Sequence, residues 1–369
     1  MEYVAELGIS REDFEAVADR FTQRTFRGRG YHHLRQRTNV FPTGTAIVDG
    51  AVVRGFPSIP RTLQLAEGVH KHFDGRFVAE EKLNGYNVRV VRLPDGEILG
   101  FTRSGVVCPF TTSVVRRDLS LDDFFDANPE TMLCGEMVGP ENPYTTCAYP
   151  EVDSIGFFAF DVRDRATGAP FPVDARNQCC DRFDIPQVPS FGRFDPDDVS
   201  DLRTVIADLD AEGREGVVMK ASDGERLLKY TTSAANQGNL SYGFQYPFDY
   251  GKEYVFPRVL REAFMAVEQD DDEKTRRERE HAVGESILGP FIEAIRAVEA
   301  GEVLAETHVV RGDPIVLDEL LEHLRNLGLT VTIESDRTRD GERLLAFSKQ
   351  YRSSTDSILA YLDGQPFGE

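Results

Sequence analysis

Short strand-like runs separated by turn residues fill the middle of this chain, and they constrain its fold more than any other feature. Between about residues 61 and 236 they read GRFVAEEKLNGYNVRVVRL, EILGFTRSG, TMLCGEMVG, IGFFAFDVRD, REGVVMKAS and RLLKYTT, with Gly, Pro and Asp between them. Few helical patterns interrupt them, apart from residues 198–212. Because parallel strands need helical crossovers, the pattern predicts a largely antiparallel α+β domain rather than a doubly wound one.

The flanking segments differ from this middle region, and at 369 residues the chain is too long for one ordinary domain. A helix-like stretch, Ser10 to Phe21, is followed by a short β-rich piece. The apolar positions of 257–300 recur at helical spacing and need cover from the core or from another subunit. The end of the chain reads strand, helix, strand, strand, helix. We expect four units: 1–60, 61–236, 237–301 and 302–369.

The first unit carries the densest basic segment, RTFRGRGYHHLRQR at residues 24–37. Its aromatic residues are interleaved with arginines, as they often are on RNA-contacting surfaces. A solvated loop accounts for the same residues more simply. We therefore expect a loop here, and RNA contact is the alternative.

The chain is strongly acidic, with 63 acidic against 42 basic residues and a formal net charge of -21. This charge alone argues against a polyanionic partner. However, only seven of the 42 basic residues are lysines, and an acidic, lysine-poor surface suits a halophilic protein dissolved in concentrated salt. Screening there shortens electrostatic interactions to about 3 Å at 1 M, so net charge says little about the ligand. An acidic protein that avoids nucleic acid is the alternative.

Location signals favour a soluble, cytoplasmic protein with no membrane partner. The start, MEYVAELGISREDFEAVADRF, lacks the basic residues and apolar run of a signal peptide, and no stretch approaches the roughly 20 apolar residues of a membrane span. Five cysteines include the adjacent Cys179 and Cys180 but no CxxC and no zinc-finger spacing. Free thiols in a reducing compartment are the simpler interpretation.

The string EEKLNGYN at residues 80–87 holds the candidate nucleophile, Lys82. A lysine attacks phosphorus only as the free amine, and at the ordinary pKa near 10.4 roughly one molecule in a thousand is deprotonated at pH 7. Neighbouring cations or a metal can lower such a pKa, and a following glycine lets a nucleotide approach closely. Lys-x-x-Gly alone is a weak signal, because about 0.6 chance matches are expected in this composition.

An ordered series of strings follows the lysine: Arg103-Ser104-Gly105, Gly135-Glu136, FFAFD at 157–161, EGVVMK at 215–220 and Leu228-Lys229-Tyr230. Each string by itself has a simpler explanation, as a turn cation, a surface acid, core aromatics or a solvated ion pair. Together they supply every residue type that nucleotidyl transfer needs, which favours a nucleotide site.

The residue types divide among the parts of a nucleotide. An aromatic face supplies a purine slot, and Glu136 and Arg103 supply ribose contacts. Lys220 and Lys229 supply cations for three phosphates, and Glu215 supplies a carboxylate for Mg²⁺. Where lysine is scarce, each one is a candidate for work that arginine cannot do, since arginine is effectively never deprotonated. This argument supports the nucleophile most directly.

The same order resembles the six motifs of the covalent lysine nucleotidyltransferase superfamily of DNA ligases, RNA ligases and capping enzymes: Lys82-x-Asn-Gly, Arg103-Ser-Gly, Gly-Glu136, Phe160-Asp, Glu215-Gly-x-x-x-Lys220 and Lys229. GPENPYT, GNLSYGFQYPFDYGKEYVFPR and the helical segment after them resemble the archaeal homodimeric ATP-dependent RNA ligases. The resemblance covers about 55–300 well and both ends more weakly. It implies an α+β fold with an antiparallel-sheet nucleotidyltransferase core of ATP-grasp-like ligase type, a small N-terminal domain, a helical dimerisation segment and a small α+β C-terminal domain.

The resemblance also implies site roles: covalent adenylate on Lys82, adenine recognition by Glu81 or Glu80, ribose contacts from Arg103 and Glu136, base stacking by Phe160, metal binding by Glu215 and phosphate contacts from Lys220 and Lys229. Asn87 stands where related RNA ligases place asparagine, while DNA ligases and capping enzymes typically place arginine. The resemblance therefore favours RNA.

The implied activity is that of an ATP-dependent RNA ligase with Mg²⁺, for which Mn²⁺ can substitute. A homodimer would adenylate itself, pass AMP to an RNA 5′-phosphate and join that end to a 3′-hydroxyl, within one molecule or between two. The alternatives are a DNA ligase or a capping guanylyltransferase, although no clear downstream barrel stands in 237–369. From a different class, a catalytically silent RNA-binding dimer is the alternative.

The sequence departs from the family pattern in two places and leaves one geometric problem. Asn84 stands where many members carry aspartate, and Lys229 lacks the second lysine of the common Lys-x-Lys. In a plain strand, Glu215 and Lys220 would lie on opposite faces. Both serve one pocket only if Glu215 lies at the mouth of the strand or a bulge intervenes.

Overall fold

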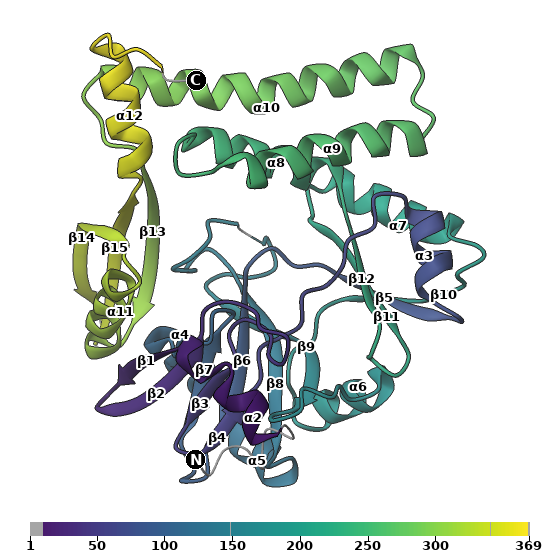
Figure 1. Ribbon diagram of the computed structural model, residues 1–369, viewed down its shortest axis with the longest axis vertical. Helices are drawn as coiled ribbons and strands as arrows, with labels where there is room; N and C mark the ends of the chain where they lie inside the picture. Colours follow the sequence, from purple (N-terminus) through teal and green to yellow (C-terminus); the bar gives the residue numbers. More distant parts are fainter. Residues whose placement is uncertain (1–9, 148, 340, 368–369) are drawn as a thin grey trace.

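Two antiparallel four-stranded sheets lie at the centre of the protein, whose computed structural model describes residues 10–147, 149–339 and 341–367 (Figure 1). The first sheet has the order β7-β6-β8-β9, with β7 Ile98–Thr102, β6 Tyr86–Arg92, β8 Thr131–Val138 and β9 Gly156–Asp164. The second sheet has the order β10-β5-β11-β12, with β10 Ser190–Phe194, β5 Phe77–Glu81, β11 Gly216–Ala221 and β12 Leu227–Thr231. The neighbouring strands of both sheets pair antiparallel, so the predicted α+β core is confirmed.

More helices interrupt these strands than the sequence pattern predicted. The predicted helix near 198–212 is present as α7 (Ser200–Ala211), but the described residues of this region form four further helices between the strands: α3 Leu65–His72, α4 Pro109–Asp118, α5 Leu121–Ala127 and α6 Val173–Arg182. Helix α4 shows why they were missed. Six of its ten residues are buried, on several sides, so it has no clear amphipathic period and its β-branched residues read as strand.

A third sheet, from the N-terminal segment, covers the first sheet. Its strands are β1 Phe21–Phe26, β2 Arg29–Leu34, β3 Ala46–Val48 and β4 Ala51–Val53. Val48 and Val53 share one apolar core with Leu99 and Phe101 of the first sheet. The basic segment 24–37 was predicted as a loop, and this is wrong, because it forms the β1–β2 hairpin.

The predicted first helix is shorter than expected. Ser10 caps α2 (Arg11–Glu15) by accepting a hydrogen bond from the backbone N–H of Asp13, so the helix begins where the sequence pattern predicted. The helix then ends, and a 3-10 turn at Ala18–Arg20 follows. The sequence pattern therefore identified where the helix starts but not its length.

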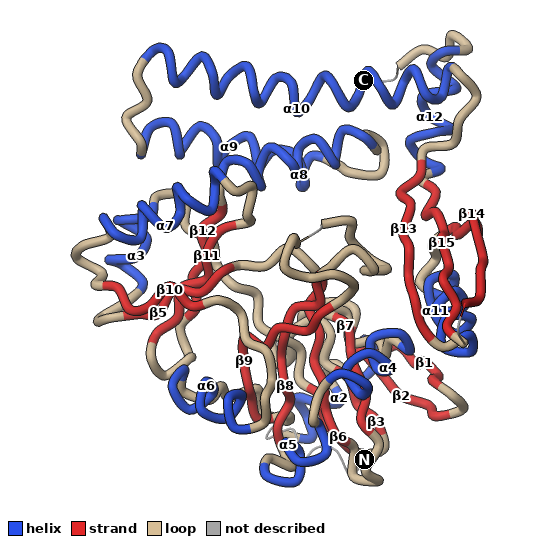
Figure 2. The backbone as a smooth tube through the Cα atoms, turned by 180° about the vertical axis from the view of Figure 1, so that it is seen from behind, coloured by secondary structure: helices blue, strands red, loops and turns tan. Residues whose placement is uncertain are grey.

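A layer of helices crosses one end of the molecule, as Figures 1 and 2 show. It comprises α8 Ser233–Gln245, α9 Lys252–Glu268 and the long α10 Glu273–Glu299. The C-terminal segment then forms the predicted strand, helix, strand, strand, helix, with β13 Ala305–Gly312, α11 Pro314–Asn326, β14 Thr330–Arg339, β15 Glu342–Gln350 and α12 Arg352–Leu362. Leucines of α11 join the core that also contains α4, so this segment packs against the first sheet.

The residue-level division into four units stays a prediction. Helix α8 runs across the expected boundary at 236/237. Nowhere in the described part of the chain is a helix long and apolar enough to span a bilayer. The five cysteines all lie within that part and are free thiols.

Candidate active site

The predicted site residues converge on one cavity of about 340 Å³ between the two central sheets. It is lined by Glu80, Glu81, Lys82, Asn87, Arg103, Glu136, Phe160, Lys220 and Lys229. The remaining member of the predicted set, Glu215, lines a neighbouring cavity of about 1060 Å³. Residues up to 149 positions apart in the sequence, Glu80 and Lys229, thus line one pocket.

Lys82 and Glu215 meet where the two cavities adjoin. Lys82 directly follows β5, and its Nζ lies 2.5 Å from a carboxylate oxygen of Glu215. The Lys82 side chain keeps 22% of its exposure, so the amine remains accessible to a ligand. This contact places the candidate nucleophile beside the candidate metal ligand.

The turn after Lys82 is fixed by close packing. A side chain at Gly85 would bring its Cβ within 2.1 Å of the Met137 carbonyl oxygen, so glycine is needed for the approach of the chain itself. The backbone N–H of Asn84 donates to the hydroxyl of Tyr149 at 2.6 Å. The turn is therefore held from two sides.

The problem of Glu215 and Lys220 is solved by the position of Glu215 just before β11. Gly216, which begins the strand, has a φ of +132°, and a Cβ there would lie 2.3 Å from the Tyr230 carbonyl oxygen. The backbone therefore turns at Gly216 before the regular alternation starts. Glu215 lies at the mouth of the strand, which is the first of the two solutions that the sequence left open.

Glu80 lies between two cations in the floor of the pocket. The Glu80 carboxylate is 1% exposed and pairs with Arg176 on one side and with Lys220 Nζ, 2.8 Å away, on the other. The same Nζ donates to the Phe160 carbonyl oxygen. Both of these contacts of Lys220 Nζ are to groups of the protein itself, and its predicted phosphate contact stays a prediction.

Glu136 and Asn87 face each other on adjacent strands of the first sheet. Burial raises the pKa of Glu136 to about 7, and Lys82 opposes this shift. Asn87 is buried, and its side-chain oxygen accepts no hydrogen bond from the described residues. Both groups are therefore available to hydrogen-bond a polar ligand such as a ribose.

Phe160 presents a half-buried ring to the cavity. Phe56 packs edge-on against it with 5.1 Å between ring centroids, and Lys220 Nζ lies 5.7 Å from its centre. A supported aromatic face of this kind suits a stacked base.

Lys229 on β12 is surrounded by other cations. Its pKa is lowered to about 8, first by burial and then by repulsion from Arg61, Lys82 and Arg103, while Glu215 acts in the opposite direction. An anion bound here would relieve the repulsion, so the surroundings suit a phosphate.

Arg103 lies exposed in the turn after β7. The buried Arg89 donates to the carbonyl oxygens of Gly44 and Thr102, and so ties this turn to the N-terminal sheet. The third sheet therefore contributes to the site by fixing the position of Arg103.

Sequence reasoning missed the arginines that surround the pocket: Arg61, Arg89, Arg176, Arg214, Arg258 and Arg261. Arginine is abundant in this chain, so no single arginine stands out as lysine does. One signal existed, because Arg258 ends the phrase GNLSYGFQYPFDYGKEYVFPR.

The carboxylates present fit a divalent metal that is shared with a ligand. Among the described residues, no group of three or more His, Cys, Asp or Glu side chains could hold a metal. The charge of Glu215 acts on Glu136, and Lys82 Nζ is the cation that pairs with Glu215 in this structure. Mg²⁺ commonly uses one or two carboxylates and takes its other ligands from phosphates and water, so these residues fit it.

An amine beside a carboxylate, a supported aromatic face and surrounding cations between antiparallel sheets define a nucleotidyltransferase of the ligase type. The RNA ligase family model matches residues 75–231, and the model for the Pab1020 ligase C-terminal region matches residues 242–365. An uncharacterized protein of Methanocaldococcus jannaschii, MJ0414, is 39% identical over 324 residues, which cover 85% of this chain and 82% of the relative.

Solved structures agree with these matches. An archaeal ATP-dependent RNA ligase, solved in two forms, superposes with a TM-score of 0.93 at 37% identity, covering 99% of this chain and 98% of the other. A putative ATP-dependent DNA ligase from Aquifex aeolicus superposes with a TM-score of 0.90 at 25% identity, covering 97% and 100%. This chain belongs to the archaeal ATP-dependent RNA ligase family, which confirms the resemblance seen in the sequence.

Proposed function

We propose that the protein seals RNA through a covalent AMP on Lys82. In the first step the Lys82 nitrogen attacks the α-phosphorus of ATP and pyrophosphate leaves. AMP then passes from the nitrogen to an RNA 5′-phosphate. In the third step a 3′-hydroxyl attacks the activated end and expels AMP.

The observation that carries this proposal is the position of the Lys82 amine. It lies 2.5 Å from Glu215, at the junction between a pocket of nucleotide character and a wider cavity. The Glu215 carboxylate holds the Lys82 nitrogen in an ion pair, and a metal bound by Glu215 would take the place of that nitrogen and release it toward the nucleotide.

We assign Glu215, with Glu136 nearby, to a divalent metal, with Mg²⁺ as the natural ion and Mn²⁺ as a substitute. When bound, the metal offsets negative charge on the phosphates. Adenine lies against Phe160, while Glu81 and Glu80 mark the adenine end of the pocket. Ribose contacts Glu136 and Arg103, and Lys229 with Lys220 is assigned to phosphates.

The RNA strand is assigned to the wider cavity beside Glu215. Its lining includes the five tyrosines Tyr144, Tyr149, Tyr242, Tyr250 and Tyr254. Aromatic rings of this kind stack on unpaired bases without reading a sequence, as joining of diverse ends requires. The substrate class is single-stranded RNA with a 5′-phosphate and a 3′-hydroxyl.

A homodimer is supported by exposed apolar residues on the helical layer. Phe256, Phe264 and Val267 recur at helical spacing on α9, and Leu288 and Ile292 do so on α10. Val267 is 73% exposed, which is unusual for a large apolar side chain that meets no partner. Sedimentation of the wild type and of Val267→Glu tests this, and a wild type that is monomeric at working salt contradicts it.

Peptide mapping after treatment with ATP and a divalent metal tests the chemistry. AMP on the peptide that contains Lys82 is the expected result, and AMP elsewhere or absent contradicts the proposal. Labelled GTP in place of ATP tests the capping alternative. A silent RNA-binding dimer would bind RNA tightly and take no label.

DNA sealing is the second candidate, because the similar structure from Aquifex aeolicus is named as a DNA ligase. Sealing of nicked DNA is compared with sealing of single-stranded RNA by the same preparation. Asn87 in the pocket favours RNA by the family pattern. The free thiols support a cytoplasmic location, which cell fractionation tests.

A further inference from the structure

Three arginines next to the site have no assigned role: Arg61, Arg258 and Arg261, here called the arginine cluster. Arg61 lies in the segment before α3, and the other two lie on α9. All three are half-buried, so a ligand can still reach them. In a chain of net charge -21, such a concentration of positive charge needs an explanation.

Strand register places the cluster beside the Lys82–Glu215 pair. The backbone N–H of Lys82 donates to Gly216 O, and Gly216 pairs with Thr231 across β11 and β12. The Thr231 hydroxyl in turn accepts hydrogen bonds from Arg61 at 2.5 Å and from Arg261 at 3.5 Å. Lys82, Glu215 and two guanidinium groups therefore lie at one end of the second sheet.

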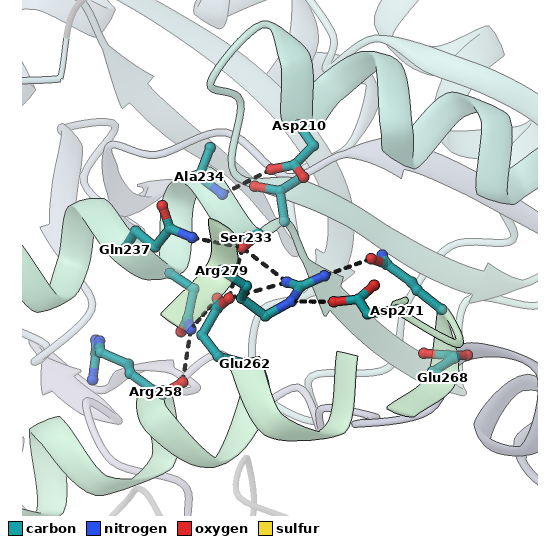
Figure 3. Close-up of polar contacts among 12 residues, drawn as sticks. Asp210, Ser233, Ala234, Gln237, Arg258, Glu262, Glu268, Asp271 and Arg279 are labelled. Carbon is teal, nitrogen blue, oxygen red and sulfur yellow. Dashed lines mark hydrogen bonds and ion pairs between the residues drawn. The ribbon is translucent and has the colours of Figure 1, made fainter. Parts of the chain in front are cut away.

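No carboxylate in the described part of the chain forms an ion pair with the arginine cluster. The nearest acid on α9, Glu262, accepts hydrogen bonds from Ser233, Asn236 and Arg279 (Figure 3). Figure 3 also shows that Arg258 joins this network only through its backbone carbonyl, while its guanidinium points away. Among the described residues, Glu215 acts on the three guanidinium groups from nearby without forming an ion pair with any of them.

The Arg258 side chain is held by neutral groups instead. Its guanidinium carbon lies 3.4 Å from the centre of the Tyr254 ring, and its Nε receives no partner among the described residues. The pKa of Arg261 is lowered to about 10, first by burial and then by the charges of Arg61 and Arg258, while Glu215 and Glu262 oppose the shift. Three like charges held together with no ion-paired carboxylate among the described residues mark a site that an anion would stabilise.

We propose that the arginine cluster, with Lys229 beside it, is a phosphate-binding subsite that holds first the departing pyrophosphate and then the incoming RNA 5′-phosphate. This inference rests on the proposed function of Lys82. Guanidinium groups form paired, charge-assisted hydrogen bonds with phosphate oxygens, which fits a site that must hold either anion.

The geometry of displacement explains the successive use of one subsite. When the Lys82 nitrogen bonds to the α-phosphorus, the bond to pyrophosphate breaks on the opposite side. In the next step an oxygen of the RNA 5′-phosphate bonds to the same phosphorus, and the N–P bond breaks as the nitrogen takes up a proton. In-line attack brings this oxygen in opposite the nitrogen, which is the side that pyrophosphate has left.

The test compares binding of one fluorescent RNA oligonucleotide carrying either a 5′-phosphate or a 5′-hydroxyl, without ATP and at constant ionic strength. The full-length wild type should prefer the 5′-phosphate, and inorganic pyrophosphate should abolish that preference without displacing the 5′-hydroxyl RNA. Arg258→Gln and Arg261→Gln should each lower both the preference and the pyrophosphate affinity by about tenfold. Arg261→Lys keeps the charge and should retain more of both than Arg261→Gln.

Arg117→Gln, an exposed arginine on α4 remote from the cluster, is the matched control and should bind like the wild type. Far-ultraviolet circular dichroism of each variant verifies folding. Folded glutamine variants that keep both the preference and the pyrophosphate affinity overturn the proposal. Loss of only one of the two properties overturns the successive use of one subsite.

The outcome is separable from that of the proposed function. A wild type that prefers the 5′-phosphate but takes no AMP on Lys82 supports the subsite and removes the lysyl-AMP chemistry. A wild type that is labelled on Lys82 yet binds both RNA ends equally supports the lysyl-AMP chemistry and removes the subsite.

Discussion

Two charged regions border Lys82, and they differ in whether their charges are paired within the protein. In the floor of the pocket, Glu80 is bracketed by Arg176 and Lys220, so each charge has a partner within the protein. In the arginine cluster, by contrast, like charges meet without a carboxylate partner among the described residues. The difference indicates that the floor is complete before any ligand binds, whereas the cluster is completed by an anion.

Replacing Lys82 should have the largest effect. Lys82→Arg keeps a cation beside Glu215 but supplies no free amine, so AMP attachment should fall by at least ~10³-fold. Labelled ATP followed by gel electrophoresis measures this. Sealing of chemically pre-adenylated RNA should survive, because the third step does not use the amine. Attachment at the wild-type rate contradicts the role of Lys82.

Removing Glu80, which pairs with two cations in the floor of the pocket, should strongly lower the free energy of unfolding. Glu80→Ala leaves two buried cations without their carboxylate, so the free energy of unfolding should fall by about 3–5 kcal/mol. Urea unfolding measures the change. Glu151→Ala is the control, since the Glu151 side chain is half-exposed beside Arg214 and its loss should matter by only about 0–1 kcal/mol. An equal loss of unfolding free energy in both variants would mean that the ion pairs of Glu80 stabilise the protein no more than an exposed ion pair does.

Removing the aromatic face should weaken nucleotide binding by an intermediate amount. Phe160→Ala should reduce ATP affinity by about 1–3 kcal/mol, as expected for loss of one stacked base. Isothermal titration with ATP measures the affinity, and Phe160→Tyr serves as the variant that retains a ring. Unchanged ATP affinity in the alanine variant would exclude stacking on Phe160.

Removing a charge from the cluster should barely change stability, in contrast to the floor. Arg261→Gln relieves repulsion from Arg61 and Arg258, so the free energy of unfolding should stay within about 1 kcal/mol of the wild type or rise slightly. Urea unfolding in phosphate-free buffer measures it. A large loss of stability would show that the guanidinium has a structural partner after all.

A pH dependence of stability is also expected from Lys229. Its folded pKa of about 8 lies below the ordinary value of 10.5, so between these two the unfolded state binds more protons. Lys229 therefore makes stability rise with pH from about 8 to 10.5. Over the same range ATP affinity should fall, because the lysine loses its charge. In Lys229→Arg both trends should be absent, which titrations at pH 7 and 9.5 test.

Much of this site could be predicted because its chemistry depends on residue type and order. A scarce lysine followed in sequence by an aromatic, two acids and two further lysines identified the pocket residues, and the structure gathers them around two adjoining cavities. The same reasoning placed Glu215 at the mouth of β11 as one of two solutions. Side-chain geometry was needed to choose between them.

Other parts could not be read locally. The strands were predicted from the turn residues between them and from their alternating apolar and polar positions. Helix α4, by contrast, is buried on several sides and lacks the period that marks a surface helix. The basic segment 24–37 looked like a loop because its own composition does not reveal that it pairs as a hairpin on the third sheet.

The sequence by itself determined which groups can do chemistry on phosphorus and in what order they occur, because reactivity belongs to the side chain. Only the tertiary structure decided which charges are neutralised. Glu80 meets Arg176, 96 positions away, and Arg61 meets Arg261 at Thr231, through strand register and the packing of α9. Two charges pair only when they lie close together in space, and a linear sequence does not specify the distance between residues far apart in the chain.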